Sequence, residues 1–155
     1  MVVACTFFLG SAGWSQPAGG RLPHACDILT DEDAEHVFGK GAHLVRSGAV
    51  CNIQPEDNKF LTLGVIQAGI SDWTDYDSDL ARDLVKYWRH KQVSGLGDDA
   101  YIGSLRSLWF IKKGTAPVSL TIKKGAANVH VSGWADFATR EEVIRYIGEK
   151  LVAGM

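Results

Sequence analysis

The histidines and cysteines have the widest chemical repertoire of any side chains in this chain. The five histidines lie far apart in the sequence and lack the short spacings that bring imidazoles onto one metal ion. No G-x-S-x-G run marks a serine nucleophile at a strand-to-helix turn. The sequence therefore predicts no metal centre, no cofactor and no catalytic residue. The histidines are His24, His36, His43, His90 and His130.

An acidic run resembles the start of a calcium loop. Asp75, Asp77 and Asp79 match its first three ligand positions. The later positions depart from it, because Leu80 replaces the required Gly and Lys86 replaces the bidentate Glu. We interpret the run as acidic residues that open a helix.

A glycine-rich run resembles a nucleotide-binding loop. Gly95-Leu96-Gly97-Asp98-Asp99-Ala100 matches the fingerprint G-x-G-x-x-A, but it precedes a predicted strand where that motif requires a helix. We expect a tight turn that uses glycine dihedral angles. With Tyr101 it is also a candidate edge of a binding surface.

Cys26 and Cys51 form an even pair outside the N-terminal segment. A disulfide between them is the natural assignment in an oxidising compartment. Closing a loop of this length stabilises a fold by roughly 3 kcal/mol. A catalytic thiol is the alternative, but no His or Asn spacing supports one.

The first twenty residues contain no Asp, Glu, Lys, Arg or His, and an apolar block is followed by small residues. This pattern is typical of the end of a secretory signal peptide. We expect residues 1–20 to be a signal peptide, or else an N-terminal tail or strand, and residues 21–155 to form a single domain. Val2–Cys5 also resembles a lipobox, so we expect membrane attachment only if Cys5 is lipidated. The predicted location is periplasmic or extracellular.

The net charge of −2 gives no argument for a nucleic-acid partner. Charge is unevenly distributed, with 12 acidic and 4 basic side chains in Leu22–Asp83 and 6 acidic and 11 basic ones in Leu84–Met155. We interpret this as complementary halves of one folded unit, and the alternative is a polar surface that orients a partner.

Lysine pairs and two tryptophans complete the candidate surface residues. Two lysine pairs, Lys112-Lys113 and Lys123-Lys124, stand at the ends of two predicted strands. Lysines at such positions protect strand edges from pairing with other strands. Alternatively, the two pairs form a basic corner that binds an anion. Trp73 and Trp134 each precede a predicted helix in a polar loop, and each is a candidate for an exposed apolar contact. The full candidate binding surface comprises Trp73, Gly95, Gly97, Asp98, Tyr101, Lys112, Lys113, Lys123, Lys124 and Trp134.

Periodicity predicts the elements that position these residues. Helices are expected over Thr30–Gly39, Thr74–His90 and Thr139–Leu151, the first opening at an N-cap threonine and the last at a capping box. Strands are expected around Leu44 and Tyr101 and over 50–54, 60–66, 107–113, 118–124 and 128–131. Short connections favour antiparallel pairing. We predict an α+β fold, an antiparallel sheet of about six strands with three helices on one face, in the order α-βββ-α-βββ(β)-α.

Several of these segments together resemble a group of small, poorly characterised exported bacterial proteins. They are Cys26–Thr30 before a short acidic helix, Cys51 opening a strand, Gly95–Tyr101, Leu108–Gly114 and Val118–Thr121. The group includes the DUF3558-like lipoproteins. The resemblance implies an exported α+β domain, a Cys26–Cys51 disulfide and no established activity. It also implies a fold similar to that of the PsbP and Mog1 type proteins.

These observations favour an exported, non-enzymatic binding domain of the cell envelope or the secreted fraction, whose partner is a protein or a small ligand. Two alternatives remain. One is a small secreted hydrolase with a dispersed active site. The other is a structural or antigenic surface protein.

Overall fold

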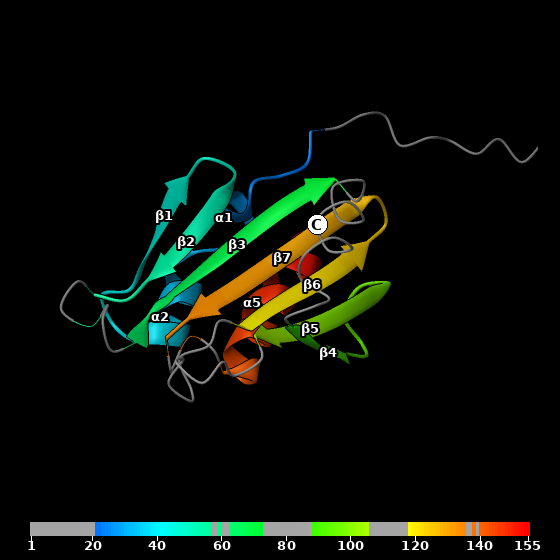
Figure 1. The fold of residues 1–155 in the computed structure, drawn as a ribbon. Helices are drawn as coiled ribbons and strands as arrows, with labels where there is room; N and C mark the ends of the chain where they lie inside the picture. The colour runs from blue at the N-terminus through cyan, green and yellow to red at the C-terminus, as the bar shows by residue number, and fades with distance from the viewer. Residues whose placement is uncertain are drawn as a thin grey trace, which may run out of the picture.

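The computed structural model describes residues 21–56, 59, 63–72, 88–105, 118–135, 138 and 140–155. Within these ranges, seven strands form one antiparallel sheet in the order β1-β2-β3-β7-β6-β5-β4 (Figure 1). The strands are β1 (His43–Ser47), β2 (Val50–Gln54), β3 (Val65–Asp72), β4 (Trp88–Gln92), β5 (Asp99–Leu105), β6 (Val118–Lys124) and β7 (Ala127–Trp134).

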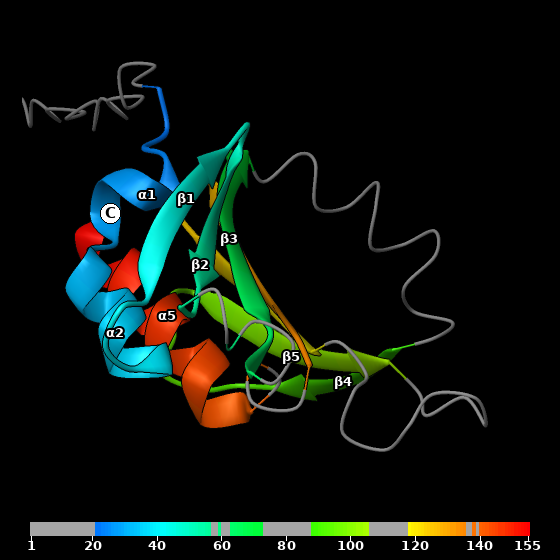
Figure 2. The same cartoon turned by 90° about the vertical axis from the view of Figure 1, so that its left-hand side faces the viewer.

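The described helices all lie on the same side of this sheet (Figure 2). They are α1 (Ala25–Ile28), α2 (Asp31–Phe38) and α5 (Glu141–Gly154). This arrangement confirms the predicted α+β class and the antiparallel sheet. The N-cap predicted at Thr30 is also confirmed, and Thr30 and Asp33 exchange hydrogen bonds in a capping box.

Helix α5 packs on β6 and β7 and forms the centre of the core. Its apolar stripe of Ile144, Ile147 and Leu151 is fully buried. Gly148 lies on the same side of the helix, where an added Cβ would come within 2.6 Å of Leu120 Cδ2. The glycine therefore allows the helix to approach the sheet closely. The opposing strand residues are Leu120, Ile122, Val129 and Val131, all with 0% of their surface exposed.

Strand β3 lies further along the chain than its sequence suggests. A strand was expected over 60–66, whereas β3 covers Val65–Asp72. Gly64 precedes it with φ of +80°, a left-handed conformation that breaks extended structure. The expected strand was therefore placed too early, and residues 60–62 lie outside the described part. The apolar run before Gly64 contains no turn residue that would have revealed this break.

The helix expected over Thr74–His90 is wrong at its C-terminal end. Residues 88–92 form strand β4, which pairs with β5 from Trp88↔Leu105 to Gln92↔Tyr101. Pairing with an available strand edge overrides the local helical period, as tertiary context often does. The rest of the expected helix, residues 74–87, and the strand expected over 107–113 lie outside the described residues.

The remaining expectations correspond to observed elements. The runs at Leu44 and at 50–54 form β1 and β2, and those at 118–124 and 128–131 form β6 and β7. The C-terminal helix was expected to open at a capping box on Thr139, but α5 covers Glu141–Gly154 and the expected capping box is not its N-terminus. The N-cap of α5 is Arg140, whose side chain makes no capping hydrogen bond.

Candidate functional site

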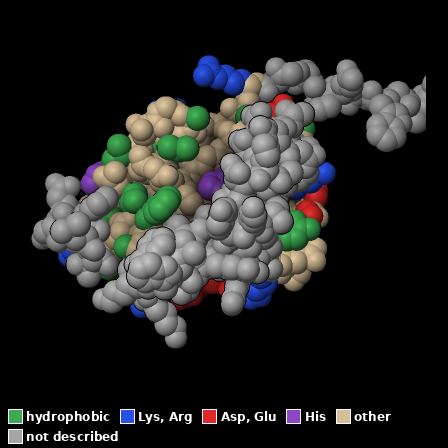
Figure 3. Space-filling view, viewed as in Figure 1, with side chains coloured by type: hydrophobic (Ala, Val, Ile, Leu, Met, Phe, Trp, Pro, Cys, Tyr) green, Lys and Arg blue, Asp and Glu red, His purple; other side chains and the backbone are tan. Residues whose placement is uncertain are grey.

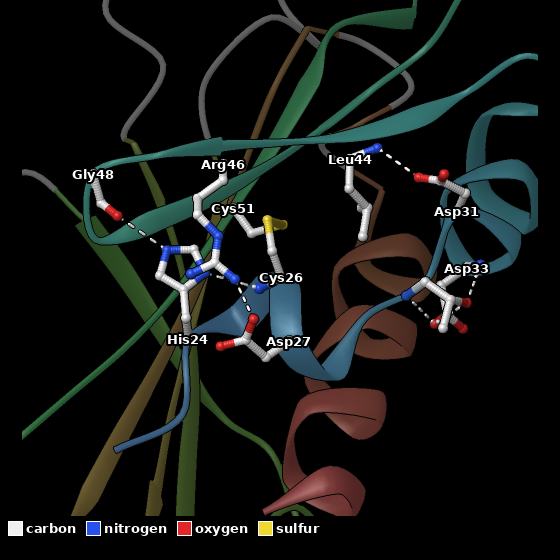
Figure 4. The surroundings of a disulfide bond; sticks show 10 residues. His24, Cys26, Asp27, Asp31, Asp33, Leu44, Arg46, Gly48 and Cys51 are labelled. Carbon is white, nitrogen blue, oxygen red and sulfur yellow. Dashed lines mark hydrogen bonds and ion pairs between the residues drawn. A yellow bond between two sulfur atoms is a disulfide. The ribbon is translucent and has the colours of Figure 1, made fainter. Parts of the chain in front are cut away.

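A disulfide fixes the N-terminal part of the domain to the sheet. Cys26 of α1 and Cys51 of β2 are joined, with their Cα atoms 5.2 Å apart (Figure 4). The structure thus confirms the predicted pairing, and a bonded sulfur cannot act as a nucleophile. A covalent link of this kind is compatible with an oxidising location.

Polar contacts around the disulfide reinforce the same junction (Figure 4). The His24 Nδ1 atom accepts a hydrogen bond from the Cys26 backbone N–H at 3.1 Å. Its Nε2 atom lies 3.0 Å from the carbonyl oxygen of Gly48 and, with Nδ1 as the acceptor, donates to that oxygen. Arg46 of β1 pairs with Asp27 of α1. These contacts hold the chain before α1 against the β1–β2 hairpin.

A cleft of about 750 Å³ opens beside this junction. Three of its polar side chains make the contacts just described, since Arg46 pairs with Asp27 and His24 bonds to the backbone. Among the described residues, its lining includes no Ser, Thr, Cys or Lys that could act as a nucleophile. The cleft is therefore best explained as part of the structural junction. Its lining residues are Arg21, Leu22, Pro23, His24, Asp27, Arg46, Gly48, Ala49 and Ile70.

A second cleft of about 450 Å³ lies between α2 and α5. Tyr146 and His36 line it, and their rings stack with centroids 4.4 Å apart. The Tyr146 hydroxyl donates to Asp33 Oδ1 at 3.0 Å. Arg145 pairs with Glu149 at 3.6 Å along the same helix. The Tyr146–Asp33 hydrogen bond and the stacked rings join the two helices, whereas Arg145 and Glu149 pair within α5.

The other side of the sheet carries a different kind of surface. Residues of the core alternate along the strands with polar ones, and the polar ones point away from the helices. We call this surface the polar face. The pairings of β2, β3, β7, β6 and β5 place the following residues on it: Val50, Asn52, Val65, Gln67, Gly69, Ser71, Asp99, Tyr101, Gly103, Ser119, Thr121, Lys123, Asn128, His130, Ser132 and Trp134.

Strand register aligns the polar face into rows. One row runs from Asn52 through Gln67 and Ser132 to Ser119. The next row runs from Gly69 through His130 and Thr121 to Tyr101. Directly opposite side chains in such rows lie about 5 Å apart. Neither central row contains Asp, Glu, Lys or Arg. Figure 3 shows this side of the molecule, where the described surface over β1–β3 carries mainly hydrophobic and uncharged side chains.

Two amide oxygens on the polar face have no hydrogen-bond partner. They are Oδ1 of Asn52 on β2 and Oδ1 of Asn128 on β7, and both atoms are buried. Asn128 itself is only 7% exposed. Leaving a buried acceptor unsatisfied costs about 1–3 kcal/mol, so each of these atoms needs a hydrogen-bond donor that the described residues do not supply.

Two ionisable groups on the polar face have shifted pKa values. The surrounding protein desolvates the His130 ring and lowers its pKa, although the side chain keeps an edge open to solvent. The shift favours the neutral imidazole, which both donates and accepts a hydrogen bond. The Asp99 carboxylate, through hydrogen bonding and its charge, raises the pKa of the Tyr101 phenol.

The structure brings only some of the candidate surface residues together. Tyr101, Lys123 and Trp134 lie on the polar face. Lys124 points to the other side, where its ammonium donates to the carbonyl oxygen of Val152 at the end of α5. Trp134 is 48% exposed and is one of few large apolar side chains exposed in the described residues. Trp73, Lys112 and Lys113 lie outside the described residues.

The glycine turn precedes β5, as expected, but it follows strand β4 where a helix was expected. Gly95 and Gly97 have φ of +82° and +59°. The Asp98 carboxylate accepts a hydrogen bond from the Gly125 N–H at 2.6 Å, and the Asp98 N–H donates to the Lys123 carbonyl at 2.8 Å. The turn therefore ties this end of the sheet to the β6–β7 hairpin. Its role in binding stays a prediction.

Sequence reasoning missed the middle of the polar face. Asn52, Gln67, His130 and Ser132 come from three strands, and only pairing brings them together. A signal was nevertheless present in β7, where Asn128, His130, Ser132 and Trp134 occur at alternate positions. A polar residue at every second position of a strand predicts a face that does not pack in the core.

Comparisons with protein-family models, curated proteins and solved structures gave no match. In the described part of the chain, His, Cys, Asp and Glu form no cluster of three or more able to hold a metal ion. No helix among these residues is long and apolar enough to cross a membrane.

Proposed function

We propose that this chain is an exported binding domain, periplasmic or extracellular, which acts without catalysis and holds its ligand on the polar face. The Cys26–Cys51 disulfide supports export, because such bonds persist in oxidising compartments. The resemblance to exported proteins and lipoproteins points in the same direction.

The observation that carries the binding proposal is the pair of unpartnered acceptors, Asn52 Oδ1 and Asn128 Oδ1. Both belong to the surface that bears the exposed Trp134. Polar groups that lack partners together with an exposed aromatic side chain are typical of a recognition surface. In contrast, polar side chains in both clefts on the helix side, among them Arg46, His24 and Tyr146, make internal contacts.

Site-specific photo-crosslinking tests the proposal. The photoreactive residue p-benzoylphenylalanine replaces Gln67 on the polar face of the full chain, expressed in the cells that naturally make it. A matched control places it at Lys40, an exposed position between α2 and β1. We expect an adduct of discrete mass from position 67 and none from position 40. No adduct from position 67, or equal adducts from both, would contradict a binding role for this face.

A further inference from the structure

The side chains of the polar face also indicate the chemical class of the ligand that it binds. This inference rests on the proposed function, because it concerns the same surface. Three properties restrict the ligand: the type of the unpartnered atoms, the absence of formal charge in the central rows, and the exposed tryptophan at one end.

The unpartnered atoms require hydrogen-bond donors. Asn52 Oδ1 and Asn128 Oδ1 are amide acceptors on two different strands. Around them lie the partly exposed Gln67 and the buried Ser132 and Thr121. The side chains of all three both donate and accept hydrogen bonds. A ligand rich in hydroxyl groups fits such a surface, because each hydroxyl donates one bond and accepts others.

The central rows favour an uncharged ligand. They contain amide, hydroxyl, imidazole and phenol groups but no Asp, Glu, Lys or Arg. An ionic group placed there would lose water without gaining an ion-pair partner, which is unfavourable. The described charged residues on this side of the sheet are Lys123 and Asp99, which share the last register row with Asn128. Their place leaves the area around Gln67 and His130 uncharged.

Trp134 supplies an apolar plane at the other end of the face. It lies on β7 opposite Val65 of β3, and its alternate neighbours on the strand are Ser132 and His130. Adjacent strands are about 5 Å apart and each residue advances about 3.4 Å. The surface from Asn52 to Ser132 and from Asn128 to Trp134 therefore measures about 10 by 20 Å, which suits several linked rings.

The backbone around Trp134 holds this plane in place. Ala135 adopts φ of 76°, a left-handed conformation that is unusual for a residue with a Cβ. Gly64 approaches so closely that an added Cβ would lie 1.7 Å from the Trp134 carbonyl oxygen. Strained backbone of this kind often occurs where a protein positions a ligand-binding group.

We propose that the polar face binds a neutral oligosaccharide. Sugar hydroxyls donate to the Asn52 and Asn128 amide oxygens and exchange hydrogen bonds with Gln67. The apolar C–H face of one sugar ring stacks on the Trp134 indole. Neutral carbohydrates combine these two features, hydroxyl edges and apolar ring faces, and carry no charge.

Calorimetric titration of the oxidised full chain tests this assignment. The probes are neutral hexasaccharides of glucose, mannose, galactose and N-acetylglucosamine, with hexagalacturonic acid as the charged comparison. We expect saturable binding of at least one neutral probe and weaker binding of the acidic one. Trp134→Ala and Gln67→Ala should each weaken affinity about tenfold, equivalent to about 1.4 kcal/mol. Lys40→Ala should leave it unchanged. Circular dichroism and intact mass verify that each variant is folded and oxidised.

Failure of the carbohydrate assignment can be separated from failure of the binding role. Absence of binding to every neutral probe, or binding that neither polar-face variant weakens, would overturn the assignment. A protein or peptide adduct at position 67 in the crosslinking experiment would also overturn it, but would leave the polar face as the binding surface.

Discussion

The Lys150 ammonium lies 2.9 Å from Oδ1 of Asp33 and joins the last helix to the first long one. Asp33 also accepts hydrogen bonds from Tyr146 and from the backbone and hydroxyl of Thr30. Burial alone raises the pKa of this carboxyl, but hydrogen bonds from Lys150, Thr30 and Tyr146 together outweigh it and lower the pKa. Asp33 thus connects α2 to α5 and caps α2 at once.

Acid sensitivity follows from this contact. Because the folded-state pKa of Asp33 is lowered, its contribution to stability is present above the unfolded value of about 3.9 and is lost as the pH falls through the folded value. Asp33→Asn should therefore reduce stability by about 1–3 kcal/mol at pH 7 and weaken the dependence on pH below 4. Urea denaturation between pH 2.5 and 7 measures both effects.

A matched control for Asp33 is Glu32→Gln, which removes an exposed carboxylate from the same helical turn. It should change stability by less than about 0.5 kcal/mol. An Asp33→Asn variant with the same acid profile as the native chain would disprove the role of this contact.

Removing the disulfide should destabilise the fold. We expect the double substitution Cys26→Ala and Cys51→Ala to cost about 3–4 kcal/mol, because the unfolded chain regains the freedom of a loop spanning a separation of 25 residues. The double variant and the reference protein both carry Cys5→Ala, so that they differ only at Cys26 and Cys51. Guanidinium denaturation measures the change, and a loss below about 1 kcal/mol would show that the bond contributes little.

Substitution of Gly64 separates backbone strain from steric clash. Gly64→Ala places a Cβ at φ of +80° and 1.7 Å from the Trp134 carbonyl oxygen, whereas Gly95→Ala meets φ of +82° with nothing within 4 Å. Dihedral strain costs about 1–2 kcal/mol in both variants, and crowding adds about 1–3 kcal/mol at Gly64. Thermal denaturation should therefore rank Gly64→Ala as clearly less stable. Equal losses would refute the close approach.

Gly148 gives a test in which two effects have opposite signs. Helix propensity alone predicts that Gly148→Ala stabilises α5 by about 1 kcal/mol. The new Cβ would lie 2.6 Å from Leu120 Cδ2 and 2.9 Å from Ile122 Cδ1 in a fully buried core. We expect crowding to dominate, with a net loss of about 1–2 kcal/mol in urea denaturation. A stabilised variant would show that α5 is packed less tightly.

Local signals in the sequence predict much of the fold. The N-cap at Thr30 and the alternation in Val118–Lys124 correspond to observed elements because adjacent residues determine them. The Trp88–Gln92 strand was missed because its conformation depends on pairing with β5, a partner about ten residues away. The start of β3 was missed because the left-handed φ of Gly64 cannot be read from its apolar neighbours.

The candidate site was less predictable than the fold. Trp134 was identified as an exposed aromatic candidate, and Tyr101 as part of the candidate binding edge beside the glycine turn. Asn52, Gln67 and Ser132 were not, because they become neighbours only through the register of β2, β3 and β7. Single polar residues in separate strands carry no local sign that they share a row. The disulfide was predictable because only two cysteines lie outside the N-terminal segment.

The most direct test of the polar face as a carbohydrate site is NMR mapping of the isotopically labelled, oxidised chain during titration with the neutral hexasaccharide that binds most tightly. We predict the largest shifts in the side-chain amides of Asn52, Gln67 and Asn128 and in the Trp134 indole N–H. Residues of the disulfide cleft and of the α2–α5 cleft should shift little. Shifts concentrated at either cleft, or the absence of any shift on the polar face, would contradict the proposal.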